Sequence, residues 1–426
     1  MTTQCYFTPV PSRRISTNGQ VEFRLAADGC RCVHVAAVWQ SGHRIEVGTY
    51  SLKPNLELVK VIPNTAGFVG QFEWELGFEN EQGEIVETLR QPYEIVKSNV
   101  HSTCLLDGCW VSIRHWSPSE SRYFKDGLEL MTDEDWRQHI FSMHNLGITT
   151  VLIQNTFDSE YYVNQHNMTA DTYDGVAFYN SNLAPRRRGM LENDPLEAIL
   201  SAADACGMAV FPGVGLYAWF DFSPESLIWH KRVATELIQR YGHHHSFYGF
   251  YISEEIMGAL YHGYSPVPDE KSKDIQNFFR EFSAFAHELA PTKPVALAPN
   301  NIDMHLYQDE WAGIMQHLDI LIPFAFARSE NNIPQIAEMC QKWDVHFWVD
   351  MEIFKFPFDD GLVPKDFPAL LKEIHDYDML EQVYGYQYTG LLNEPGKNSK
   401  HLGGADTEAL YKEFYRYQLH RRGLSQ

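Results

Sequence analysis

Short apolar runs alternate with segments of helical periodicity from about residue 105 to the C-terminus. There are eight such runs, each of strand length: Cys109–Arg114, Thr149–Gln154, Met208–Leu216, Phe247–Glu255, Pro294–Asn300, Leu318–Phe324, Val345–Ile353 and Val383–Leu391. Strands that alternate with helices form a parallel sheet covered by helices. Eight repeats over about 320 residues favour a closed (β/α)8 TIM barrel, an α/β fold, over an open doubly wound sheet.

The boundaries of the intervening helices support this pattern. Thr132–Asp135 resembles a capping box, and Asp194 followed by Pro195 is a typical helix start. No Gly-x-Gly-x-x-Gly motif follows the first apolar run, which argues against a dinucleotide-binding fold.

The first hundred residues have a different pattern. Their apolar residues alternate in short runs separated by turn signals such as Asp28-Gly29 and Gln82-Gly83, and they contain no convincing helix. This spacing predicts a small all-β sandwich over residues 1–100, placed as an accessory domain before a catalytic barrel over residues 105–426.

Charge and composition exclude several classes of partner. The chain of 426 residues carries 34 Lys and Arg against 56 Asp and Glu, a net charge of −22, which argues against nucleic acid and anionic membrane surfaces. No apolar stretch reaches the length of a membrane span, and the N-terminus does not read as a signal peptide. Seven scattered cysteines fit reduced thiols, and we expect a cytoplasmic protein.

Glutamates close two of the eight runs. Barrel active sites lie at the C-terminal ends of the strands, where the fourth run ends in Glu254-Glu255 and the seventh in Glu352. These strands are three apart around the ring, so their ends should face each other across the mouth. Glycoside hydrolysis needs such a pair, one carboxylic acid to protonate the leaving oxygen and one carboxylate opposite it.

The residues around these glutamates resemble a known group of enzymes. Phe250–Glu255 and Phe347–Glu352 are similar to strands 4 and 7 of the clan-A glycoside hydrolases, particularly the β-galactosidase-like branch. The resemblance implies that Glu255 is the acid/base and Glu352 the nucleophile. Glu254 stands where the clan has an Asn that bonds the sugar 2-hydroxyl, which leaves open whether Glu254 or Glu255 is the acid.

A closer likeness joins the first and fourth strands. Gly108–Trp116 and Tyr248–Glu255 look like an uncharacterised bacterial family of barrels expected to be glycoside-hydrolase-like. That family implies the fold and the reaction class but no substrate.

Other strand ends carry groups suited to binding a sugar. Aromatic faces stack on the C–H faces of pyranoses, and amides form hydrogen bonds with hydroxyls. Arginines can hold the two glutamate carboxylates ionised or bind an acidic sugar. The candidate substrate-binding residues are Arg114, His115, Trp116, Asn155, Trp219, Asn300, Arg328 and Tyr388. The long aromatic-rich segment 156–193 is expected to form a lid or wall at the mouth.

The sequence therefore predicts a glycoside hydrolase, retaining in mechanism, that acts on a carbohydrate with Glu255, Glu352 and Glu254 at its site and with no metal or cofactor. Two alternatives stay open. One is a non-catalytic carbohydrate-binding barrel, and the other is an enzyme acting on a phosphorylated small molecule through the Gly403-Gly404 loop. His243–His245 precedes the fourth strand and should lie away from the mouth. The sequence does not determine the sugar, the linkage or the oligomeric state.

Overall fold

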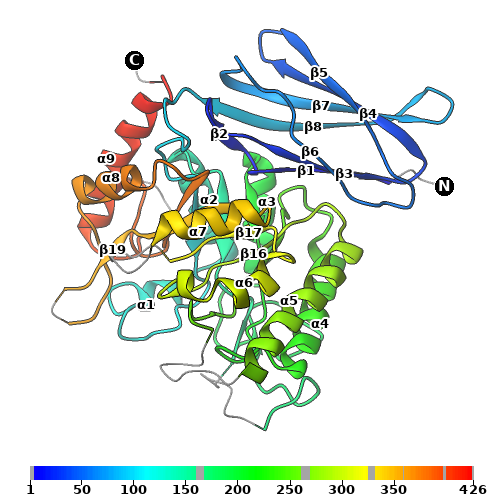
Figure 1. The fold of residues 1–426 in the computed structure, drawn as a ribbon. Helices are drawn as coiled ribbons and strands as arrows, with labels where there is room; N and C mark the ends of the chain where they lie inside the picture. The colour runs from blue at the N-terminus through cyan, green and yellow to red at the C-terminus, as the bar shows by residue number, and fades with distance from the viewer. Residues whose placement is uncertain are drawn as a thin grey trace.

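The computed structural model describes residues 4–159, 167–260, 269–324, 332–357, 359–396 and 400–424 (Figure 1). Two small sheets come first in the chain, and a barrel of parallel strands surrounded by helices follows.

The barrel strands coincide with the eight runs predicted from the sequence. They are β9 (Gly108–Val111), β10 (Thr150–Ile153), β13 (Ala209–Phe211) with β14 (Gly213–Val214), β15 (Phe250–Ile252), β16 (Val295–Leu297), β17 (Ile320–Leu321), β18 (His346–Glu352) and β21 (Gln382–Tyr386). They pair in the order β13-β10-β9-β21-β18-β17-β16-β15-β14.

The third strand closes the ring although it is interrupted. Pro212, which has no N–H to donate to a sheet, separates β13 from β14. β13 pairs with β10 on one side and β14 pairs with β15 on the other, so both edges of the sheet belong to one stretch of chain. The predicted (β/α)8 barrel is confirmed.

The helices cover the outside of the barrel. They are α1 (Lys125–Leu128), α2 (Asp133–Asn145), α3 (Pro195–Cys206), α4 (Pro224–Tyr241), α5 (Asp269–Leu289), α6 (Gln308–Met315), α7 (Ile333–Lys342), α8 (Phe367–Asp376) and α9 (Ala405–Arg421), with a short 3-10 turn at Met304–Leu306. Both predicted helix starts are confirmed. Thr132 and Asp135 form a reciprocal capping box on α2, and the Asp194 side chain accepts the Glu197 N–H at 3.0 Å on α3.

Alternation along each strand decides which side chains enter the barrel, because successive side chains of a strand point to opposite faces. The interior is filled by large buried residues that include Trp110, Leu152, Phe211, Tyr251, Ile320, Trp348 and Tyr384. Residues of the other parity, such as Val349 and Met351, pack outward against the helices.

The N-terminal residues form two sheets. One consists of β1 (Cys5–Val10), β3 (Glu22–Ala27) and β6 (Val59–Val61), and the other of β2 (Arg14–Ser16), β8 (Ile85–Val96), β7 (Gly70–Asn80), β4 (Cys30–Trp39) and β5 (Arg44–Ser51). Residues of both, such as Phe23 and Trp74, share one buried core with ring centroids 5.0 Å apart. The division of the chain into domains at residues 100–105 stays a prediction.

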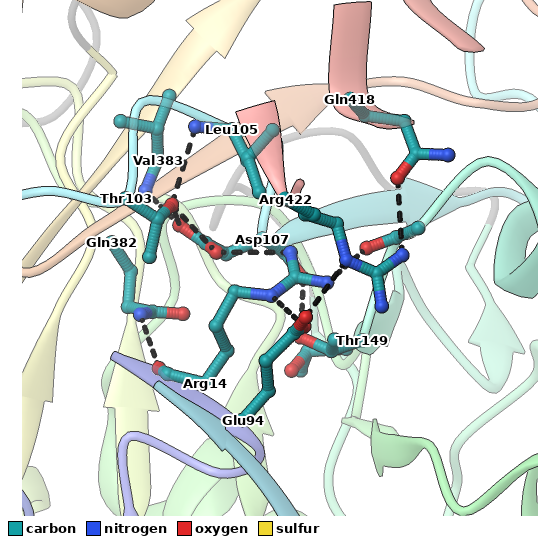
Figure 2. A network of polar contacts seen from close by, with 12 residues as sticks. Arg14, Glu94, Thr103, Leu105, Asp107, Thr149, Gln382, Val383, Gln418 and Arg422 are labelled. Atoms are coloured by element: carbon teal, nitrogen blue, oxygen red, sulfur yellow. Dashed lines mark hydrogen bonds and ion pairs between the residues drawn. The ribbon is translucent and has the colours of Figure 1, made fainter. Parts of the chain in front are cut away.

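Polar contacts join these sheets to the barrel at the N-terminal ends of its strands. Arg24 Nη1 lies 2.5 Å from Asp319 Oδ1, just before β17. Arg14 contacts Glu94 and also Asp107, just before β9 (Figure 2). The sheets therefore cover the bottom of the barrel and leave the C-terminal ends of its strands on the opposite face.

Two short antiparallel pairs follow strand ends at the mouth: β11 (Phe157–Asp158) with β12 (Val176–Ala177), and β19 (Phe354–Lys355) with β20 (Val363–Pro364). None of the described helices is both long and apolar enough to cross a bilayer.

Candidate active site

Glu255 lies just beyond the end of β15 and is partly exposed. Its carboxyl group contacts Trp219, which lines a cavity at the C-terminal ends of the strands, so its side chain is directed to the mouth. Trp219 Nε1 donates a hydrogen bond to Glu255 Oε2 at 3.0 Å, and the Asn300 side chain bonds the same carboxyl group. Burial raises the pKa of Glu255 to about 7, which is the range that a proton donor needs at neutral pH.

Glu254 has the opposite orientation. It is 1% exposed, its Oε1 accepts the Tyr217 N–H at 2.8 Å, and the same oxygen lies 3.9 Å from His230 Nε2 on α4. Burial raises the pKa of Glu254 well above its usual range and lowers that of His230 to about 4, so the contact is between two neutral groups at neutral pH. The structure places Glu254 in the wall between the barrel and α4, away from the mouth.

Glu352 ends β18 and shares the inward parity of Trp348 and Asp350. Lys365 Nζ lies 3.6 Å from Glu352 Oε2 and 2.5 Å from Glu373 Oε1. A nearby ammonium favours the charged form of a carboxyl group. The Lys365 contact therefore favours an ionised Glu352.

Asp350 lies two residues before Glu352 on the same face and is buried. Burial, and secondly the charge of Glu352, raise the pKa of Asp350 well above its usual range. Asp350 is therefore neutral under the mouth, and its proton relieves the repulsion that two adjacent carboxylates would otherwise exert.

Two tryptophans form an aromatic surface beside Glu255. Trp116 is 41% exposed, and its ring meets Trp219 edge to face with centroids 5.1 Å apart and planes at 74°. The His115 ring stacks on Trp116 at 6.0 Å and 24°. A pyranose ring can pack on such a surface, because the C–H face of the sugar is apolar.

A cavity of about 240 Å³ collects most of the binding residues predicted from the sequence. Its lining includes Arg114, His115, Trp116, Asn155 and Trp219, contributed by the ends of the first three strands, together with Ser253 from the fourth. The structure thus brings five of the eight candidates to one cavity, and a sixth, Asn300, lies against Glu255.

The cavity arginines already have partners. Arg114 Nη1 lies 2.9 Å from the fully buried Glu192, and Arg187 Nη1 lies 2.8 Å from Asp158. Arg114 therefore ties the segment before α3 to the first strand, and its ionic partner among the described residues is Glu192 rather than Glu255 or Glu352.

Tyr388 is the prediction that needs correction. It is fully buried, and its hydroxyl lies 2.5 Å from Ser142 Oγ on α2, behind the barrel wall. The inward residues of the eighth strand are Tyr384 and Tyr386, and β21 ends at Tyr386, so the alternation of the strand does not extend to Tyr388. Arg328 lies outside the described residues.

Glu120, in the loop after β9, lies near the mouth but is not among the candidates predicted from the ends of the strands. Burial raises its pKa to about 7, and Oε2 lies 3.7 Å from His115 Nε2, whose own pKa burial lowers to about 4. The Glu120 carbonyl accepts the Leu362 N–H at 2.8 Å, which joins this loop to the segment after β18. No periodic pattern in the sequence indicates a loop residue such as Glu120. The alternation of β21, in contrast, indicates that Tyr386 points inward like Tyr384.

Metal-type clusters lie elsewhere in the described part of the chain. Two groups of three potential ligands occur there: Cys32, His34 and Glu79 on the N-terminal sheet, and Glu197, His243 and His244 at the base of the barrel. Both nitrogens of His244 contact carboxylates, at 2.7 and 3.0 Å. Neither group includes a residue of the mouth.

Comparison with known proteins gives a family and a fold. A family model described as "Domain of unknown function (DUF4434)" matches residues 106–399, and no curated protein sequence matches the chain. A structure from Bacteroides thetaiotaomicron named "putative alpha-L-fucosidase" is 16% identical, with a TM-score of 0.54 over 75% of this chain and 94% of that one.

Two β-glucuronidase structures align over more of the chain but less well. The enzyme from Parabacteroides merdae is 12% identical with a TM-score of 0.42 over 98% of this chain and 53% of its own. The one from Dictyoglomus thermophilum is 11% identical with a TM-score of 0.43 over 97% and 68%. The chain thus spans little more than half of the first enzyme. The resemblance to glycoside hydrolase barrels and to an uncharacterised family is confirmed, and at these identities the structural likeness concerns the fold.

Proposed function

This chain belongs to the DUF4434 family, and we propose that it is a glycoside hydrolase that cleaves an O-glycosidic bond at the barrel mouth. The observation that carries the proposal is the pair of unlike carboxyl groups at the ends of β15 and β18. Glu255 has a pKa raised to about 7, whereas Glu352 lies 3.6 Å from the Lys365 ammonium. Glycoside hydrolysis needs one carboxyl group that is protonated and one that is ionised.

The roles follow from these environments. Glu255 gives its proton to the glycosidic oxygen as the bond from that oxygen to the anomeric carbon breaks, while the Glu352 carboxylate attacks the anomeric carbon. Glu255, now ionised, takes a proton from a water that displaces Glu352 from the glycosyl-enzyme. Two displacements at one carbon give net retention of configuration.

The aromatic surface beside Glu255 supports a carbohydrate as the substrate. Trp219 bonds Glu255 and also meets Trp116 edge to face, so a sugar ring packed on the exposed Trp116 would lie next to the proton donor. Asn155 and Ser253 line the adjoining cavity and offer polar groups for hydroxyls.

Glutamine variants test the proposal. The chain would first be screened against 4-nitrophenyl glycosides, and the substrate with the highest turnover used for Glu255→Gln and Glu352→Gln. Each variant should lose at least about a hundredfold in kcat/KM, because it lacks a proton donor or a nucleophile. Turnover by both variants at the rate of the parent would refute the assignment.

Two further variants make the result specific. Glu413→Gln, at an exposed position of α9, is the matched control and should keep parental activity. Glu254→Gln should retain measurable acid catalysis, because the Glu254 carboxyl group faces Tyr217 and His230 rather than the mouth.

A non-catalytic carbohydrate-binding protein is the second candidate, and one observation favours it. Glu254 occupies the position of the clan's Asn and is 1% exposed, so it supplies no amide at the mouth for a sugar 2-hydroxyl. Calorimetric binding of a sugar, with no product after prolonged incubation, would select this alternative over hydrolysis.

The phosphate-binding alternative has less support. At Gly403 a Cβ atom would come within 2.5 Å of the Gly390 carbonyl oxygen, and φ is +95°. Close packing against residue 390 and a left-handed backbone thus account for this glycine without a phosphate.

A further inference from the structure

A second, larger cavity of about 590 Å³ lies between the N-terminal sheets and the base of the barrel. Arg14 and Glu94 of the sheets line it together with Gly147 and Met208 from loops that precede barrel strands. It is therefore at the opposite end of the barrel from Glu255. Its volume is within the range of small-molecule sites.

Arg13 lines this cavity and has no ionic partner among the residues that the structure describes. It is 8% exposed, and the one hydrogen bond of its side chain to a described residue runs from Nη2 to the Met208 carbonyl at 3.4 Å. Nε and Nη1 are buried without any hydrogen-bond partner. The nearby Asp204 is engaged by the His244 side chain and the Ser246 N–H, both at 2.7 Å.

This guanidinium remains charged at neutral pH. Burial lowers the pKa of Arg13 only to about 10. A buried cation without a counter-ion is costly, since desolvation is not offset by an opposite charge. An anion entering the cavity would supply that charge.

Arg14, the next residue in the chain, differs from Arg13 because its guanidinium has ionic partners. Arg14 donates to Glu94 Oε2 at 2.9 Å, to Asp107 Oδ1 at 3.3 Å and to the Gly147 carbonyl at 2.6 Å (Figure 2). Arg422 binds the other oxygen of Glu94 at 2.9 Å. Glu94 is thus fully occupied and does not neutralise Arg13.

The charge of the lining is positive although the chain as a whole carries −22. Four arginines line the cavity against two glutamates: Arg13, Arg14, Arg90 and Arg422, with Glu73 and Glu94. The aromatic side chains Trp39, Phe72 and Tyr93 also line it and offer an apolar wall.

We infer that this basal cavity binds a small oxyanion-bearing molecule of sugar size, a carboxylate or a phosphate, through Arg13. Guanidinium groups form strong charge-assisted hydrogen bonds with carboxylate and phosphate oxygens, and Nε and Nη1 of Arg13 have no other partner among the described residues. The aromatic wall accommodates the body of the molecule. This site is separate from the proposed hydrolase site at the mouth.

Isothermal titration calorimetry on the full chain tests the inference. The probes are D-glucuronate, D-glucose 6-phosphate and inorganic phosphate, with D-glucose as the neutral comparison. At least one anion should bind, and Arg13→Gln should weaken it at least tenfold. Binding of glucuronate or the sugar phosphate but not inorganic phosphate would identify an anionic sugar, whereas equal binding of inorganic phosphate would identify the free anion.

Matched variants complete the design. Arg31→Gln removes an exposed guanidinium paired with Glu79 and should leave binding unchanged, as should Glu352→Gln at the mouth. Failure of hydrolysis therefore does not affect this test. Absence of binding by all three anions, or equal binding by Arg13→Gln, would overturn the inference.

Cysteine protection gives a second readout that requires no variant. Cys206 is partly buried and lines the cavity, whereas Cys32 lies on the N-terminal sheet outside it. A bound anion should slow alkylation of Cys206 by N-ethylmaleimide at least threefold, measured by peptide mass spectrometry, and leave Cys32 unchanged. Equal slowing of both thiols, or of neither, would contradict a ligand in this cavity.

Discussion

Two adjacent glutamates just beyond the end of β15 lie in opposite environments. Glu255 reaches the mouth and contacts Trp219 and Asn300. Glu254 turns into the wall, where the Tyr217 N–H satisfies one of its oxygens. Glu255 is thus directed to the mouth, whereas Glu254 bonds the backbone of the third βα loop.

The raised pKa of Glu255 predicts how stability depends on pH. Because the folded pKa of about 7 exceeds the unfolded one, the folded state holds a proton that the unfolded state loses first, and stability falls as pH rises from about 4.5 to 7. Glu255→Gln removes this penalty. We expect the variant to gain about 1–3 kcal/mol over the parent at pH 8 but little at pH 4.5.

Urea unfolding of the parent, Glu255→Gln and the exposed control Glu413→Gln at both pH values measures this effect. A constant difference between Glu255→Gln and the parent at pH 4.5 and 8 would contradict the raised pKa, since only a titrating group makes the difference change with pH.

At the level of elements, buried ion pairs fix the segments around the mouth. The fully buried Glu192, before α3, is held by Arg114 at the end of the first strand. Arg187, in the same long segment, forms a half-buried pair with Asp158 at almost the same distance. The two pairs therefore differ chiefly in burial.

This difference predicts unequal costs of substitution. Arg114→Met leaves the Glu192 carboxylate buried without a partner and should lower the free energy of unfolding by about 3–5 kcal/mol. Arg187→Met breaks a pair that solvent still reaches and should cost about 0–1 kcal/mol. Denaturant titration of both variants provides the measurement, and similar losses would show that burial does not determine the strength of these pairs.

The sequence predicted the order of the barrel elements well, because each strand is a continuous apolar run and several helices carry explicit caps. It did not predict the interruption at Pro212, since an apolar run continues on both sides of that residue. Tyr388 was misplaced because it lies two residues beyond the end of β21, where strand alternation no longer determines the direction of a side chain.

The composition of the mouth was less accessible to sequence analysis. Glu255 and Glu352 were chosen as candidates because they follow or end strands, where barrel function is concentrated. Lys365 lies on the loop that returns to α8, and Glu120 lies on the first βα loop. Their proximity to the strand ends depends on loop conformation, which carries no periodic signal.

On the scale of the whole molecule, ionic contacts join the N-terminal sheets to the barrel. Arg24 is fully buried, and its guanidinium bonds Asp319 and the Thr292 carbonyl, both of the barrel, and Glu22 of its own strand. These contacts, with those of Arg14 in Figure 2, make the sheets part of the barrel base.

Removal of this contact should destabilise the chain as a unit. We expect Arg24→Gln to lower the free energy of unfolding by about 2–4 kcal/mol, because Glu22 and Asp319 lose their buried counter-ion. Arg44→Gln, on the exposed face of β5, should change it by less than about 1 kcal/mol. Thermal and urea unfolding would measure both, and an Arg24 variant as stable as the Arg44 variant would show that this contact does not hold the sheets to the barrel.

The central claim, that the barrel mouth is a retaining glycosidase site with Glu352 as nucleophile, is tested most directly by covalent trapping. The chain would be incubated with a panel of 2-deoxy-2-fluoroglycosyl fluorides, which slow the hydrolysis of the glycosyl-enzyme, and then analysed by peptide mass spectrometry. We expect one glycosyl unit on the peptide that contains Glu352, absent from Glu352→Gln. A glycosyl unit on another residue, or equal labelling of Glu352→Gln, would contradict it.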